Sequence, residues 1–175
     1  ELARTPVAVI SAGAKSILDL PKTLEVLETQ GVPVIGYRTA TFPAFYARAC
    51  DLPVPVQVDD VVQLAAMLKT QWSLDYPGGA LIANPIPEAA AIPAAEIQAA
   101  IDQALAEARQ HNITGKPVTP FLLARISELT GGHSLEANIA LVRNNVRLGT
   151  ELALALGQAQ KGAEIDNQKK SALHY

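Results

Sequence analysis

The first half of the chain alternates short apolar runs with segments of helical spacing, and this alternation restricts the fold more than any other feature. Four runs have the β-branched, buried composition of strands, at 7–10, 32–37, 54–58 and 80–84. Parallel strands need long crossover connections, usually helices, so the alternation predicts a mostly parallel sheet with covering helices. Pro53 and Pro55 place the third strand at a sheet edge, because proline cannot donate to a strand ladder.

The second half of the chain shows helical periodicity and no convincing strand. Ile97, Ile101 and Leu105 keep one apolar face between residues 93 and 110. A shorter helix is also expected earlier, over 42–50. The chain is therefore predicted to be an α/β protein of layered α/β/α architecture, in which a mostly parallel sheet is followed by a helical C-terminal half.

Helix starts are marked by residues whose side chains can accept a backbone hydrogen bond. Asp19 precedes a helix with proline in its first turn, and Asp59 or Asp60 precedes the next one. Thr119, which is followed by proline, and Ser134 are predicted to cap two later helices. The Asp59-Asp60 pair and Ser134 are therefore interpreted as structural caps, in preference to a ligand pair or a nucleophile.

Composition argues against several classes of protein. With 49% hydrophobic and 18% charged residues, the chain can bury a core as one domain, predicted over 1–157, and its tail at 158–175 is expected to fray. The formal charge of -3, without a basic cluster, argues against a nucleic-acid partner. No run reaches the roughly 18 apolar residues that would span a membrane. A single cysteine, Cys50, fits a reducing compartment, so a cytoplasmic location is expected.

Lys15, in the segment SAGAKSILD, is the strongest candidate for covalent chemistry. It follows the first predicted strand, and open α/β sheets bind ligands beyond the carboxyl ends of their strands. A nucleophilic lysine must be neutral, which an amine with an ordinary pKa of about 10.4 achieves near pH 7 only through burial or nearby positive charge. A Schiff base with a sugar aldehyde is therefore the predicted chemistry, weighed against the commoner solvated role of a loop lysine.

Other motifs in the chain indicate less. The fragment GAKS lacks the glycine that a phosphate-binding loop requires before its lysine, because Ala14 stands there. The histidines at 111, 133 and 174 are far apart, and His111 with Glu107 is interpreted as a solvated helix face. No metal ligand is therefore assigned within this chain.

Three asparagines in the last predicted helix need an explanation, because asparagine is a poor residue for a helix interior. Asn138 and Asn145 share a helix face with Leu141 and Leu148, and Asn144 is adjacent to it. An amide on an inward face is either hydrogen-bonded structure or a ligand contact, and the spacing favours neither.

Four segments resemble the indigoidine synthase A-like family, also called the pseudouridine-5′-phosphate glycosidases. They occur in the family's order within a resemblance that covers 1–155. The segments are SAGAKSILDLPKTLEVLETQGVPVIGY at 11–37, FPAFYAR at 42–48, ANPIP at 83–87 and TPFLLARISELTGGHSLEANIALVRNN at 119–145.

The resemblance implies a function as well as a fold. It implies an α/β/α homotrimer that reversibly cleaves the C–C glycosidic bond of pseudouridine 5′-phosphate to uracil and ribose 5-phosphate. Lys15 matches the lysine that forms the covalent sugar intermediate, and Asn138 matches a substrate-binding asparagine of the active site. A C–C bond has no glycosidic oxygen to protonate, so the two-carboxylate mechanism of ordinary glycosidases does not transfer.

The resemblance also implies that part of the site comes from outside this chain. The family's proton-donating glutamate, a substrate-contacting lysine and the motif that supplies a Mn²⁺ ligand all match positions before Glu1, so activity is expected to require the amino-terminal part. The family's GYGTDEFPAF reads GYRTATFPAF here, which introduces Arg38, Ala40 and Thr41. The alternatives are a non-catalytic split or truncated member that acts as a structural or binding module and, less favoured, another Schiff-base enzyme such as an aldolase.

Overall fold

The sheet has four parallel strands, and the last strand in the sequence lies in its interior. The computed structural model describes residues 1–15 and 18–172, and side chains as far as residue 158. Its strands are β1 (Ala8–Ser11), β2 (Val34–Tyr37), β3 (Val56–Val58) and β4 (Ala80–Ala83), in the order β1-β4-β2-β3. All three pairings are parallel, which confirms the predicted sheet, and β3 lies at an edge as its prolines indicated.

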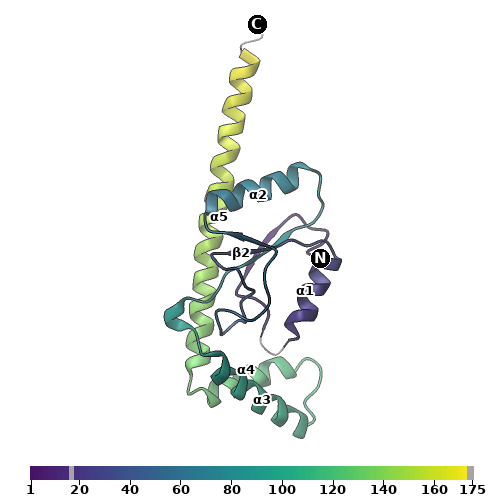
Figure 1. Cartoon of the computed structure of the whole chain (residues 1–175), viewed down its shortest axis with the longest axis vertical. Coiled ribbons are helices and arrows are strands. Elements are labelled where there is room, and N and C mark those ends of the chain that lie inside the picture. Colours follow the sequence, from purple (N-terminus) through teal and green to yellow (C-terminus); the bar gives the residue numbers. More distant parts are fainter. Residues whose placement is uncertain (16–17, 173–175) are drawn as a thin grey trace.

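Helices cover both faces of the sheet and one end of it (Figure 1). They are α1 (Leu20–Thr29), α2 (Val61–Ser73), the short 3₁₀ helix η1 (Glu88–Ala90), α3 (Ala94–Gln110), α4 (Val118–Leu129) and α5 (His133–Ala172). Because successive strand residues point to opposite faces, Val34 packs with leucines of α1 while its neighbour Ile35 packs with leucines of α2 and α5. The three layers confirm the predicted α/β/α architecture.

Two of the predicted helix caps are confirmed. Asp19 accepts a hydrogen bond from the Lys22 amide at 3.1 Å, and Asp60 accepts from the amides of Val62 and Gln63 at 2.7 and 2.9 Å. These bonds satisfy amides that have no partner within their helices.

The other two predicted caps are wrong. Helix α4 begins at Val118, one residue before Thr119, because Pro117 already has the helical φ of -65°. Ser134 lies inside the first turn of α5 and is buried, and its amide donates to the Thr130 hydroxyl at 3.2 Å. Thr130 therefore binds the amide at the start of α5, and the buried Ser134 side chain forms a hydrogen bond with the side chain of Tyr46.

The helix predicted over 42–50 is also absent: within this described segment the chain forms a loop. The Phe42 amide donates to the Leu52 carbonyl at 2.8 Å, and the Phe45 amide donates to the Ala12 carbonyl at 2.9 Å. Phe45 has a left-handed φ of +63°, and the Phe42 side chain is buried. Tertiary hydrogen bonds and burial of an aromatic ring have overridden the local helical pattern here.

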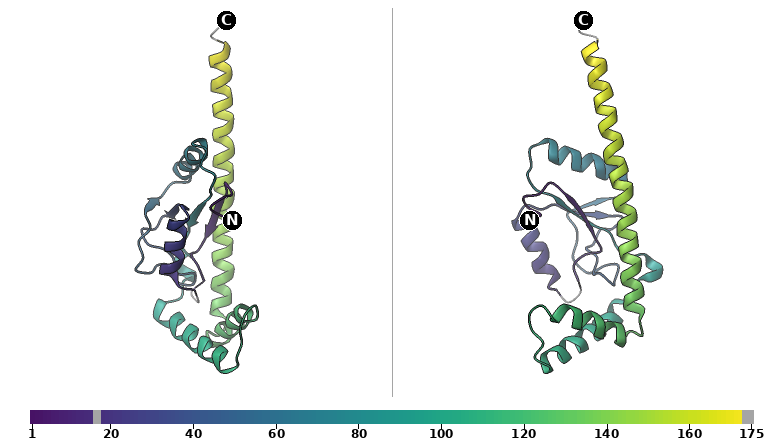
Figure 2. Two further views of the ribbon diagram at one scale, coloured as in Figure 1. Left: turned by 90° about the vertical axis from the view of Figure 1, so that its right-hand side faces the viewer. Right: turned by 180° about the vertical axis from the view of Figure 1, so that it is seen from behind.

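Helix α5 runs the length of the molecule and extends past the sheet and the other helices (Figure 2). It continues to Ala172, although the helical periodicity of the sequence fades near Gln158. The division of the chain after residue 157 and the fraying of 158–175 stay predictions. Within the described residues, no helix is long and apolar enough to cross a membrane.

A bidentate ion pair between Arg125 and Glu107 joins α3 to α4. The Arg125 guanidinium donates to both carboxylate oxygens of Glu107, at 2.5 and 3.0 Å, and also to Glu128 at 2.8 Å. Glu107 is therefore bound to the neighbouring helix, which corrects the interpretation of Glu107 and His111 as a merely solvated face. Hydrogen bonding from Arg125 holds the pKa of Glu107 below its ordinary value.

This pKa shift predicts a loss of stability in acid. A carboxylate with a lowered pKa in the folded state stabilises the fold above its ordinary pKa, and this contribution disappears as the pH falls through the lowered value. Replacing Glu107 with Gln should therefore reduce the decrease in the free energy of unfolding between about pH 6 and about pH 3, measured by urea denaturation. Glu25→Gln, on the exposed side of α1, is the matched control, and an equal effect of both substitutions would contradict the prediction.

Candidate active site at the carboxyl edge of the sheet

Three neighbouring strands end at the same edge of the sheet, and a candidate site residue follows each of them. Lys15 comes after β1, Asn84 directly after β4 and Arg38 directly after β2. The main-chain amide of Asn84 donates to the Ser11 carbonyl at 2.8 Å, so the ends of β1 and β4 are fixed side by side. Ligands of parallel α/β sheets bind at this edge.

The turn that carries Lys15 is closely packed. The Ser11 hydroxyl donates to the Gly13 carbonyl at 2.6 Å, and Gly13 has a left-handed φ of +87°. A side chain at residue 13 would overlap the Pro43 carbonyl oxygen, so only glycine allows the two backbones to approach this closely. The turn therefore fixes the path of the main chain that leads to Lys15.

Lys15 lies between β1 and α1, where the sequence analysis placed it, and is half-buried. Its carbonyl accepts a hydrogen bond from the Leu18 amide at 2.8 Å. Helix α1 begins only at Leu20, and the carboxylate of Asp19 caps its first turn. Residues 16 and 17 of the SAGAKSILD segment lie outside the described residues.

The asparagines of α5 divide into structural and available amides. Asn84, which is buried, donates through Nδ2 to Oδ1 of Asn145 at 2.9 Å, and Asn144 donates through Nδ2 to the Pro85 carbonyl at 3.0 Å. The two asparagines at 144 and 145 are thus hydrogen-bonded structure that joins α5 to the end of β4. Asn138 is half-buried two turns earlier, and its side chain forms no hydrogen bond with another described residue.

The regions of Lys15 and Asn138 meet in one apolar cluster. Ala12, at the end of β1, belongs to the same buried cluster as Ala137 and Leu141, which flank Asn138 on α5. The structure thus brings together the segments that hold both predicted site residues. Among the described residues, no hydrogen bond joins Lys15 to Asn138, so their cooperation in one site stays a prediction.

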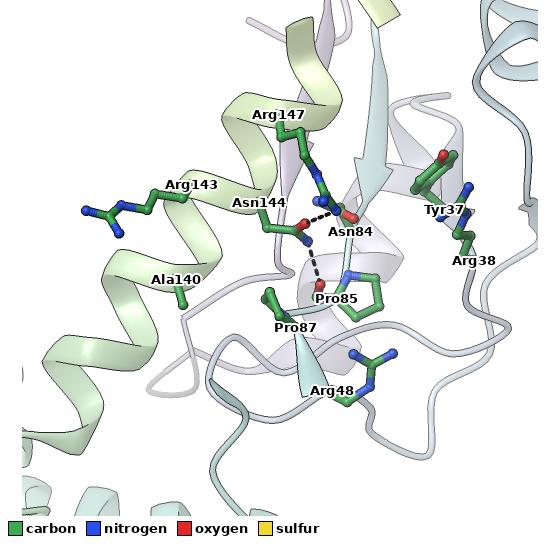
Figure 3. A pocket seen from close by; sticks show the side chains of 10 residues that line it. All are labelled: Tyr37, Arg38, Arg48, Asn84, Pro85, Pro87, Ala140, Arg143, Asn144 and Arg147. Carbon is green, nitrogen blue, oxygen red and sulfur yellow. Dashed lines mark hydrogen bonds between the residues drawn. The ribbon is translucent and has the colours of Figure 1, made fainter. Parts of the chain in front are cut away.

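A pocket of about 490 Å³ opens beyond β2 and β4, against α5 (Figure 3). Lys15 is not among the residues that line it. We call it the arginine pocket, and its lining residues are Tyr37, Arg38, Arg48, Asn84, Pro85, Pro87, Ala140, Arg143, Asn144 and Arg147.

Sequence reasoning missed this pocket, although one signal was present. Asn84 follows a buried strand directly, which is the same argument that singled out Lys15. The arginines come from the loop after β2, from the 42–50 loop and from α5, and no local pattern connects these three segments.

The described residues contain no group of three or more His, Cys, Asp and Glu side chains placed to hold a metal ion. Manganese in proteins prefers carboxylate and other oxygen ligands, and the described carboxylates form no such group. The residues described therefore do not fit the Mn²⁺ that the family resemblance implies.

The fold and this edge together define an α/β protein of the class that binds its ligand beyond the carboxyl ends of parallel strands. A sequence profile described as "Indigoidine synthase A like protein" matches residues 1–155. The chain belongs to the indigoidine synthase A-like family, which confirms the resemblance found in the sequence.

Curated relatives with high identity carry one name, pseudouridine-5′-phosphate glycosidase. The protein from Methylobacterium nodulans is 59% identical over 160 residues, which cover 91% of this chain and 48% of the relative. The protein from Caldanaerobacter subterraneus is 56% identical over 163 residues, covering 93% of this chain and 53% of the relative. The chain spans about half the length of the curated relatives it matches.

Solved structures show the same fold. The prealnumycin C-glycosynthase AlnA, solved in complex with ribulose 5-phosphate, is 38% identical and superposes with a TM-score of 0.84 over 92% of this chain and 53% of AlnA. An indigoidine synthase A-like protein from Thermotoga maritima is 35% identical, with a TM-score of 0.80 over 89% of this chain and 51% of that protein.

The close approach at Gly13 predicts a specific cost of adding a side chain. Gly13→Ala should lower the free energy of unfolding by about 3 kcal/mol or more, because the new methyl group meets the Pro43 backbone in addition to the left-handed strain. Gly115→Ala is the matched control: its φ is +68° with nothing within 4 Å, so only the strain of about 1 kcal/mol remains. Chemical denaturation measures both, and equal losses would show that the Pro43 contact is unimportant.

Proposed function

We propose that this chain supplies the nucleophile-bearing half of a glycosidase that cleaves the C–C bond of pseudouridine 5′-phosphate. The observation that carries the proposal is Lys15, which follows β1 at the ligand-binding edge of the sheet within a chain of this family. The names of the curated relatives, and the ribulose 5-phosphate in the AlnA complex, support a sugar phosphate as the ligand class.

The proposed chemistry begins at the side-chain nitrogen of Lys15. Attack of Nζ on C1′ of the sugar breaks the bond from C1′ to the ring oxygen, which takes up a proton. Protonation of the uracil ring carbon then allows the C–C bond to break, while the nitrogen lone pair forms a C=N bond to C1′. Water hydrolyses this imine, which releases ribose 5-phosphate and restores the amine. Asn138 is proposed to orient the sugar phosphate.

The remaining groups of the reaction are proposed to come from an amino-terminal part, and the curated relatives, of which this chain spans about half the length, leave room for one. These are the proton donor for the uracil carbon, a substrate-contacting lysine and the ligand of a Mn²⁺ ion. When bound, a divalent cation polarises oxygen atoms and neutralises developing negative charge. This chain contributes the lysine turn, the Asn138 amide and the strand ends that position them.

Borohydride trapping tests the nucleophile. In the assembly that contains the amino-terminal part, reduction in the presence of ribose 5-phosphate should fix the sugar on the peptide that contains Lys15, detected by mass spectrometry. Lys15→Ala should lose the adduct and at least about a thousand-fold of the turnover rate.

Lys22→Ala is the matched control, because Lys22 is an exposed lysine in the first turn of α1 that pairs only with Asp19 among the described residues. It should retain both the adduct and the turnover. An active assembly that gives no adduct on Lys15 would exclude the proposed mechanism. Turnover of other carbonyl substrates without dependence on manganese would instead favour an aldolase.

The outer face of α5 supports a proposal about assembly. A surface for assembly also fits the second candidate function, a structural or binding module without catalysis. Leu135, Ile139, Val142 and Val146 recur at spacings of four, three and four residues and are 45–63% exposed. We call this set the α5 stripe. Apolar residues at heptad spacing pack against another helix, and we propose that the partner is α5 or a neighbouring helix of other copies of this chain, as in a homotrimer.

A charge in the α5 stripe should disrupt this assembly. Val142→Glu is expected to shift the particle mass toward that of the monomer, measured by light scattering during size-exclusion chromatography. Val62→Glu is the control, since Val62 is 66% exposed on α2, outside the stripe. An unchanged mass for Val142→Glu would exclude the stripe as the contact between copies. Intact assembly without any uracil release, even with the amino-terminal part present, would favour the non-catalytic module.

A further inference from the structure

The arginine pocket carries positive charge that its own lining does not neutralise. Four of its lining residues are arginines, and none of the described residues that line it is acidic. Arginine is fully protonated at every physiological pH, so the charge is permanent. The wall between the arginines is neutral, formed by asparagine, tyrosine and proline side chains.

Three of these arginines are held in place by neutral acceptors. Arg48 donates through Nη1 to the Ile86 carbonyl at 2.7 Å, and Arg38 donates through Nε to a main-chain carbonyl, that of Asp59, at 3.1 Å. Arg147 donates through Nη2 to Oδ1 of Asn144 at 3.0 Å. Carbonyl and amide oxygens orient a guanidinium without cancelling its charge.

The contrast with Arg125 shows that the chain can neutralise an arginine when the role is structural. Arg125 is bound by two carboxylates, Glu107 and Glu128, at 2.5–3.0 Å. In the pocket, the nearest equivalent is Glu151, whose carboxylate lies 4.0 Å from Nε of Arg147 and does not line the cavity. Neutral acceptors therefore orient Arg38, Arg48 and Arg147, and these arginines keep further N–H donors that can bind a ligand.

Two of the guanidinium groups point toward the same segment of the chain. In Figure 3, Arg48 and Arg147 reach toward the Asn84-Pro85 segment from opposite sides, whereas Arg143 extends away from it. This segment follows β4 directly and is fixed by the bond from Asn84 to Asn145. A ligand between Arg48 and Arg147 would thus lie at the carboxyl edge of the sheet, against a rigid support.

We propose that the arginine pocket binds a phosphate group, with Arg48 and Arg147 as its principal donors and Arg38 at its rim. Each guanidinium group can donate two parallel N–H hydrogen bonds to two oxygens of a phosphate. Because a phosphate has several such oxygens, it is the anion that best fits guanidinium groups from separate elements. The inference stands apart from the glycosidase proposal, because Lys15 does not line the pocket. The phosphate can belong to the sugar phosphate or be a separate anion, and the experiment distinguishes these sources.

Inorganic phosphate is the first probe. Titration calorimetry on the 175-residue chain should show saturable binding that weakens with added salt. Arg48→Gln and Arg147→Gln should each raise the dissociation constant at least about ten-fold, and Arg48→Lys should have an intermediate effect. Arg109→Gln, an exposed arginine on α3, is the matched control and should bind as the unaltered chain does. Circular dichroism verifies that each variant is folded.

Ribose 5-phosphate identifies the source of the phosphate. If the pocket holds the sugar's own phosphate, Arg48→Gln raises the ribose 5-phosphate concentration needed for half-maximal trapping on Lys15 in the assembly that contains the amino-terminal part, and inorganic phosphate competes. If the anion is separate, trapping is unchanged while phosphate binding is still weakened by Arg48→Gln. Either result supports the pocket. Absence of saturable phosphate binding, or equal binding by all arginine variants, overturns it. A missing Lys15 adduct with intact phosphate binding would overturn only the glycosidase proposal.

Discussion

The hydrogen bonds of Asn84 connect the parts of the molecule on which the candidate site depends. Its amide binds the Ser11 carbonyl at the end of β1, and its side chain binds Asn145 on α5. Because Asn84 is almost wholly buried, an unpaired amide there would carry a large desolvation penalty, so both partners are needed. One residue thus fixes the lysine turn, the central strand and the long helix relative to one another.

Helix α5 presents different chemistry on its two sides. Inward, Leu141 and Leu148 fill the core, while Asn144 and Asn145 satisfy polar groups at the end of β4. Outward, the α5 stripe exposes apolar surface, and Arg143 and Arg147 border the arginine pocket. Helix α5 therefore packs against the sheet and also borders the arginine pocket. Because both of its sides carry apolar and polar residues, its sequence lacks a simple amphipathic pattern.

Features encoded by neighbouring residues were predictable from the sequence, and features that depend on distant contacts were not. The strands and the caps at Asp19 and Asp60 follow from composition within a few residues, and the position of Lys15 follows from the strand that precedes it. The loop at 42–50 departs from its helical pattern because its backbone bonds Ala12 and Leu52, both outside the segment. The arginine pocket unites three segments whose proximity only the fold creates.

The place of β4 within the sheet has a consequence for how the chain reaches its native state. Strands β1 and β2 do not pair with each other, since β4 lies between them and pairs with both. The interior of the sheet therefore cannot form until a strand about seventy residues after β1 has arrived, and closing so long a loop is entropically costly. Folding should be slow and highly cooperative, and a chain that ends before residue 80 would leave two strands without a common partner.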